Sequence, residues 1–74
     1  MSDILCAEDG AQFGATIQRT EDGPQASYLV TLDVGNTTKT ERDLRQFAND
    51  AEARRWLDGE AARRGFTQYP VELI

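Results

Sequence analysis

Two stretches in the first half of the chain alternate between apolar and polar residues. In the first, Phe13, Ala15 and Ile17 are separated by small or polar residues. The second stretch repeats the pattern at four positions, Tyr28, Val30, Leu32 and Val34. A period of two is typical of a strand that buries one face. The polar segment 21–24, which contains Gly and Pro, predicts a turn that joins the two strands into an antiparallel hairpin.

The segment after a second turn at 35–38 has an ambiguous pattern. Leu44 and Phe47 are three residues apart, as on one side of a short helix. The same segment also alternates at Thr40, Arg42 and Leu44, as in an exposed strand. We favour a third strand over residues 39–47, because a helix start signal follows directly after it.

That start signal is Asn49, a preferred N-cap residue, with Glu52 three positions later as in a capping box. Acidic residues open the predicted helix and arginines close it, which suits the helix dipole. Gly65 stands where a C′ glycine is expected. The apolar stripe of this helix consists of Ala53, Trp56, Leu57 and Ala61. We expect Trp56 to be a core residue.

The C-terminal segment alternates again at Tyr69, Val71 and Leu73. Because Pro70 lacks a backbone donor, this strand should lie at a sheet edge or pair only beyond the proline. The helix returns the chain, so the last strand should run parallel to the first and third strands. The prediction is therefore an α+β fold: a small antiparallel or mixed sheet in the order β-β-β-α-β, with one helix packed on one face. Residues 1–74 form a single domain, in which residues 1–10 are a loose arm or short edge segment.

Composition excludes several classes of catalytic and metal site. The 74 residues include no His and one Cys, which excludes Ser-His and Cys-His nucleophile pairs, internal disulfides and Cys- or His-based metal sites. We expect no enzymatic activity, no metal and no cofactor. The N-terminus lacks the basic and apolar regions of a signal peptide, and no apolar run approaches the ~18 residues of a membrane span. With a lone Cys6, we expect a cytoplasmic protein.

The charge of −5 is unevenly distributed. Residues 1–38 hold six acids and one base, whereas residues 39–74 hold seven of each. One interpretation is an acidic surface that binds a protein with a basic surface; the other is that these acids only keep a small domain soluble. The candidate partner-binding residues are Glu8, Asp9, Glu21, Asp22 and Asp33. The arginines of the second half all have an acid within four positions, which favours solvated ion pairs over phosphate contacts.

The segment 45–52, continued to Trp56 and Leu57, resembles a strand-to-helix junction found in some small phage-encoded anti-CRISPR proteins. The resemblance is local and carries no contact residue over to this chain. It implies a non-catalytic inhibitor that binds a nucleic-acid-handling effector, such as a CRISPR effector complex, and blocks its DNA-binding site. Small size and localised acidity agree with that function.

Two alternatives remain. Three strands and a helix are similar to the arm-type DNA-binding domains that insert a three-stranded sheet into the major groove. That function requires bases on the strands, and the first hairpin has Arg19 alone. The other alternative is a generic protein-interaction domain. We expect a protein partner, no direct contact with nucleic acid or membrane, and a monomer or weak homodimer.

Overall fold

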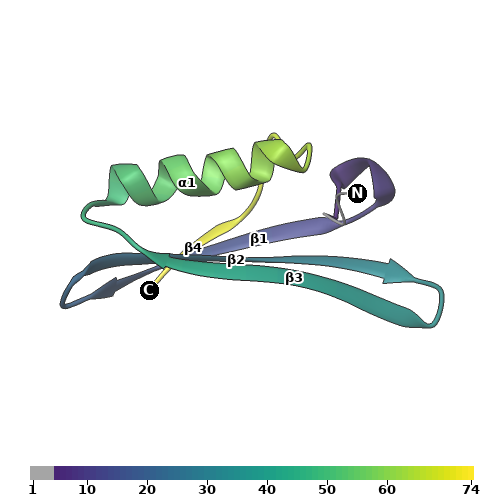
Figure 1. The fold of residues 1–74 in the computed structure, drawn as a ribbon, viewed down its shortest axis with the longest axis horizontal. Coiled ribbons are helices and arrows are strands. Elements are labelled where there is room, and N and C mark those ends of the chain that lie inside the picture. The colour runs from purple at the N-terminus through teal and green to yellow at the C-terminus, as the bar shows by residue number, and fades with distance from the viewer. Residues whose placement is uncertain (1–4) are drawn as a thin grey trace.

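A computed structural model describes residues 5–74 of the chain as one sheet with a helix lying across it (Figure 1). The elements in chain order are the short 3-10 helix η1 (Ala7–Asp9), β1 (Gln12–Thr20), β2 (Gly23–Val34), β3 (Thr37–Gln46), α1 (Asp50–Arg63) and β4 (Val71–Leu73). The ambiguous segment is thus a strand. No helix among these residues is long and apolar enough to cross a membrane.

The sheet has the strand order β3-β2-β1-β4. β1 pairs with β2, and β2 with β3, in antiparallel register, while β4 runs parallel to β1. The predicted α+β fold, with the last strand at an edge, is confirmed. The connection through α1 returns the chain across the sheet and makes the parallel pairing of β4 with β1 sterically accessible.

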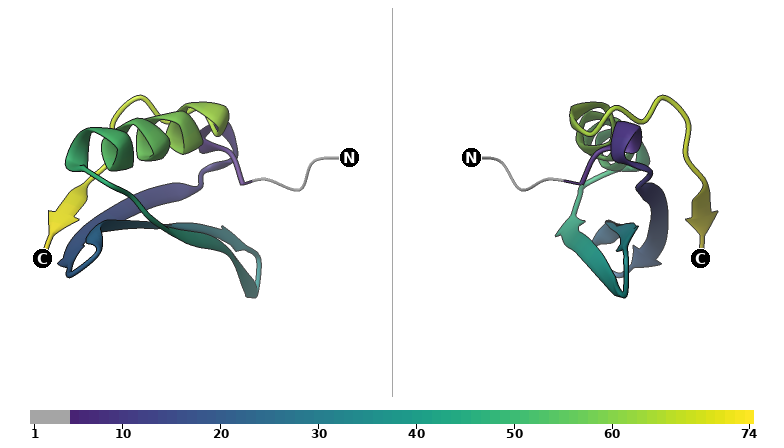
Figure 2. Two further views of the ribbon diagram at one scale, coloured as in Figure 1. Left: turned by 60° about the vertical axis from the view of Figure 1, so that its left-hand side comes forward. Right: turned by 90° about the vertical axis from the view of Figure 1, so that its right-hand side faces the viewer.

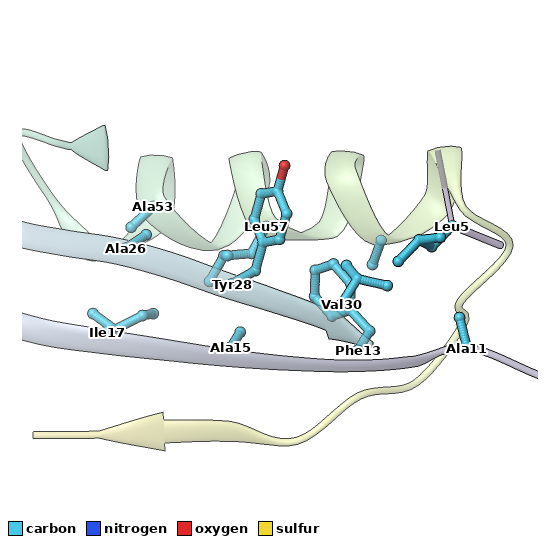
Figure 3. Close-up of a cluster of buried hydrophobic side chains, with 11 residues drawn as sticks. Leu5, Ala11, Phe13, Ala15, Ile17, Ala26, Tyr28, Val30, Ala53 and Leu57 are labelled. Atoms are coloured by element: carbon cyan, nitrogen blue, oxygen red, sulfur yellow. The ribbon is translucent and has the colours of Figure 1, made fainter. Parts of the chain in front are cut away.

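The core lies between α1 and the side of the sheet that the alternating apolar residues form. Figure 3 shows that Phe13, Ala15, Ile17, Ala26, Tyr28 and Val30 point toward the helix. From the helix, Ala53, Leu57 and Ala61 meet them and are fully buried. Small residues on both sides let the helix approach the sheet closely. Phe13 is the aromatic centre, in ring contact with Tyr28, Phe66 and Tyr69.

The helix begins and ends where the sequence predicts. The Asn49 side-chain oxygen accepts a hydrogen bond of 2.9 Å from the backbone N–H of Glu52, so one of the unpaired amides of the first turn is satisfied. At the other end Gly65 takes a φ of +83°, the left-handed conformation that a C′ glycine adopts at low cost. Trp56 is partly buried: its ring packs on Tyr28 and Phe47 at the rim of the core.

The β1–β2 turn requires a glycine at position 23. Gly23 has a φ of +115°, and a Cβ atom there would lie 2.5 Å from the carbonyl oxygen of Phe47. This close approach brings the chain entering α1 against the turn. The side chain of Gln46 also binds this turn, because its amide donates to the Thr20 hydroxyl and to the Gly23 carbonyl.

Two predictions about position differ from the structure. Residues 5–10 are not a loose arm: Leu5 is buried, and the Ala7 amide donates to the Arg64 carbonyl at 2.7 Å. Residues 1–4 of the predicted arm lie outside the described residues. Val34 continues the apolar alternation but is 45% exposed. The reason is that the far end of the β2–β3 hairpin extends beyond the end of the helix (Figures 1 and 2).

A candidate protein-docking face

The sheet has one side covered by α1 and one side with no element against it in the described chain (Figures 1 and 2). Paired residues of neighbouring strands share a face, so the register assigns every side chain to one side. We call the side away from α1 the open face. Its positions are Gln12, Gly14, Thr16, Gln18 and Thr20 of β1, Gly23, Gln25, Ser27, Leu29, Thr31 and Asp33 of β2, Thr38, Thr40, Arg42, Leu44 and Gln46 of β3, and Glu72 of β4.

The open face is poor in charge for a chain in which 28% of residues are charged. Its charged members are Asp33, Arg42 and Glu72, and most of the others are Thr, Ser or Gln. Leu29 and Leu44 are exposed there at 45% and 56%. Arg42 is the cross-strand partner of Leu29, so one base lies beside these leucines. Few charges, exposed apolar side chains and an arginine are features found at the centre of protein–protein interfaces.

The open face is hollowed around Gly14. Because Gly14 has no side chain, its position between Thr16 and Leu29 leaves two shallow depressions that share these three residues. One extends toward Arg42 and Leu44 and has a volume of about 480 Å³; the other extends toward Pro70 and Glu72. A Cβ atom added at Gly14 would meet no other atom within 4 Å, so the glycine is not required by packing.

The five acidic residues predicted to bind a partner do not form one surface. Glu21 and Asp22 form the β1–β2 turn. Asp33 lies near the opposite end of the sheet, and Asp9 joins it at a small depression there (Figure 1). Glu8 belongs to η1 at that same end. The structure therefore divides the acids into two groups at opposite ends of the sheet instead of a single acidic hairpin surface, and Glu8 lies on the α1 side, where it lines a depression with Ala62 and Gly65.

Arg64 differs most from the prediction that the arginines of the second half form solvated ion pairs. Its side chain is 3% exposed and lies over the ring of Tyr28, 4.9 Å from the ring centre. Its guanidinium donates to Glu41 Oε1 at 3.1 Å, to the Glu60 carbonyl at 2.7 Å and to the Tyr28 hydroxyl at 3.2 Å. This cluster ties α1 to β2 and β3. A sequence cannot reveal it, because Arg64 and Glu41 are 23 positions apart.

The other arginines are exposed, and some pair with acids in the described chain. Arg19 contacts Asp50 at 3.2 Å, and Arg63 contacts Glu60 at 2.9 Å. Arg45 lies over the Trp56 ring, 5.6 Å from its centre. Arg42 forms no ion pair with any residue in 5–74 and is the one base on the open face.

The shifted pKa values lie on the covered side and have structural causes. Burial raises the pKa of Tyr69 to about 12, helped by its hydrogen bond to the Asp58 carboxylate. Burial also raises the pKa of Tyr28, against the lowering effect of the Arg64 guanidinium. The hydrogen bond from Arg64 holds the pKa of Glu41 below its usual range. These groups hold helix to sheet, and of the three Tyr28 also lines one of the hollows around Gly14.

Among residues 5–74, no group of three or more His, Cys, Asp or Glu is arranged to hold a metal ion. Comparison with protein-family models, with curated proteins and with solved structures finds no match to this chain. The site is therefore described by its own geometry. The sequence signal that could have found it is the alternation of β1 and β2, which leaves Thr16, Leu29 and Thr31 on the side away from the buried residues.

Proposed function

We propose that this domain is a non-catalytic protein-binding protein whose open face docks onto a partner with a basic surface. The observation that carries the proposal is the arrangement of the open face. Two exposed leucines, the hollow at Gly14 and Arg42, its one base, form the centre, and acidic groups stand at both ends of the sheet. An apolar centre with a charged rim is the usual anatomy of a protein interface.

The acidic ends favour a basic partner. Charges at the rim of an interface contribute mainly to the rate of encounter and to the choice of partner, while the buried centre contributes most of the affinity. This chain has a net charge of −5 and acids at the ends of the docking face. Such a charge is complementary to a basic partner surface that otherwise binds nucleic acid. In its specific form, the proposal is a cytoplasmic inhibitor of the anti-CRISPR kind that occupies the DNA-binding site of an effector.

Direct DNA binding is less well supported by the same geometry. A sheet placed in a groove of DNA needs several bases on the strand face that meets the phosphates. Arg42 is the base that this face offers, and Asp33 and Glu72 share the face with it.

The experiment uses purified CRISPR effector complexes and measures both capture by this protein and the effector's DNA binding. The informative variant is Leu29→Lys combined with Leu44→Lys, which replaces the two exposed apolar side chains of the centre by charges. The matched control adds two lysines on the outer side of α1, Ala51→Lys with Ala62→Lys, where both alanines are exposed. The proposal expects the unmodified protein to displace DNA and the first variant to bind at least about tenfold more weakly. The control should bind like the unmodified protein.

A second variant tests the rim. Charge reversal at Glu21 and Asp22 should slow association several-fold and reduce its salt dependence, since rim charges act on encounter. Equal binding by the Leu29/Leu44 variant and its control would reject the open face as the docking site. DNA binding by the protein itself, with a steep salt dependence, would instead support the nucleic-acid alternative.

A further inference from the structure

The outer edge of β3 presents, over most of its length, backbone groups that pair with no other residue in 5–74. β3 is the end strand of the sheet, and of its ten residues only Glu41 is partly buried. The Phe47 amide donates to the Pro24 carbonyl at 2.9 Å, which fixes the residues that bond to β2. Since hydrogen-bonding direction alternates along a strand, odd-numbered residues of β3 face β2. The N–H and C=O groups of Thr38, Thr40 and Arg42 therefore point out of the sheet.

The two edges of the sheet differ in how they are protected. β4 is three residues long and follows Pro70, and both features limit pairing with another chain. β3 is ten residues long, pairs with β2 in continuous register without a bulge and contains no proline. Charged side chains alone protect it, so the order of these charges decides which strand can pair with it.

We propose that β3 pairs with β3 of a second copy of this chain, antiparallel, with Thr40 of each copy opposite the other. This register sets Lys39 opposite Glu41 of the second copy, twice by symmetry, and Thr38 opposite Arg42. Shifting the centre to Lys39 or Glu41 would oppose two like charges, and centring on Arg42 would oppose Glu41 to Asp43. Opposite charges across a strand pair stabilise it and like charges destabilise it.

Both members of the ion pair are available for it. Lys39 is the sole lysine of the sequence, and it forms no ion pair with the residues described here. Glu41 accepts from Arg64 and from the Leu5 amide through Oε1, which leaves Oε2 to meet a lysine from outside. Arg64 thereby holds the Glu41 carboxylate in place at the edge before a second copy arrives.

The structure also marks where such pairing would end. The Leu44 amide, which points outward, donates to the side chain of Asp43 at 2.7 Å and is not available to a second strand. The paired segment is thus limited to residues 38–42, with about six main-chain hydrogen bonds for the symmetric pair. A short polar segment of this size fits a weak dimer and not a fibre.

The dimer would be one continuous sheet. Residues opposite each other in an antiparallel pair share a face, so both open faces lie on one side and both helices on the other. α1 packs on β1 and β2, which leaves room beside β3 (Figure 1). The inference does not rest on the proposed function, because it uses the backbone edge of β3 and the Lys39–Glu41 pair, which lies on the α1 side of the sheet.

Sedimentation velocity from micromolar to millimolar protein concentration tests the proposal. We expect a monomer–dimer equilibrium in the unmodified protein. Thr40→Pro should abolish the dimer, because it removes an outward-pointing donor while leaving the bonds between β3 and β2 intact. Lys39→Glu should raise the dimer dissociation constant about tenfold or more, because two attractive pairs become repulsive. Arg55→Glu is the control: it makes the same change in charge on an exposed helix position and should not affect the dimer.

Circular dichroism of each variant confirms that it is folded, and Lys39→Glu keeps the test decisive if Thr40→Pro unfolds. A monomer at all concentrations would overturn the proposal. So would a dimer that persists in folded Lys39→Glu and Thr40→Pro, or one that Arg55→Glu disrupts equally, since the contact would then lie elsewhere or depend on net charge alone.

Discussion

The covered and open faces of this sheet are built from the same three long strands but from different side chains. On the covered face, β1 and β2 contribute Phe13, Ile17 and Val30, which are at most 4% exposed. On the open face, the neighbouring positions hold threonine, glutamine and Leu29, which is 45% exposed. One residue step along a strand therefore separates a position that determines folding from one that is free to serve binding.

The difference shows how a chain of 74 residues divides its apolar residues between the core and the exposed face of the sheet. A small core offers few apolar contacts, so nearly all large apolar residues of β1 and β2 face α1. An exposed leucine on the other side adds little to stability, and its presence there needs another explanation. The same reasoning distinguishes the two sheet edges, because the edge that is not shortened or blocked is the one free to pair.

The largest expected effect is the difference in unfolding free energy between a Leu→Ala substitution on the covered face and one on the open face. Leu57→Ala removes a fully buried side chain and should lower the free energy of unfolding by about 2–5 kcal/mol. Leu44→Ala, at a site 56% exposed, should change it by less than about 0.5 kcal/mol. Urea unfolding followed by circular dichroism measures both. Similar losses for the two variants would mean that the open face is covered in solution.

Acidification should produce a smaller effect, and it should act through the covered face. The Arg64 hydrogen bond lowers the pKa of Glu41 in the folded state below its ordinary value of 4.5. A lowered folded-state pKa contributes stability above the unfolded-state pKa, and that contribution is lost as the pH falls through the folded-state pKa. Unfolding free energies measured from neutral pH to pH values below 4.5 should therefore decline.

Two glutamine variants separate the Glu41 contribution from general acid effects. Glu41→Gln should show a flatter decline with acidification than the unmodified protein, because it has no carboxylate to protonate at this contact. Glu52→Gln removes an exposed carboxylate that has no ion pair in the described chain, and it should keep the original decline. Identical curves for all three proteins would show that the Arg64–Glu41 contact does not contribute to acid sensitivity.

The smallest expected effect has the opposite sign. Gly14→Ala should raise the unfolding free energy by about 0.5–1 kcal/mol, because glycine weakens a strand interior and no atom lies within 4 Å of the added Cβ. The same change begins to fill the hollow on the open face. A variant that is more stable yet binds its partner more weakly would support a functional reason for this glycine; unchanged binding would remove Gly14 from the site.

Local patterns in the sequence determined most of the fold. Alternation at Phe13, Ala15 and Ile17 placed the first strand and its buried face, and Asn49 and Gly65 marked the helix ends. These features depend on neighbours within a few positions, so the sequence displays them directly. The acidic residues were predicted to bind a partner, but their positions along the chain did not reveal that they lie at two ends of the sheet.

What only the tertiary structure decided are the relations between distant segments. The sequence predicted solvated ion pairs for the arginines, yet folding buries Arg64 on Tyr28 with Glu41, because α1 packs against β2 and its C-terminal end meets residues of β2 and β3. The burial of Leu5 and the exposure of Val34 were likewise decided by where the helix ends. Strand and helix periods are local properties of a sequence, but the element that lies against each position is fixed by the global packing of the chain.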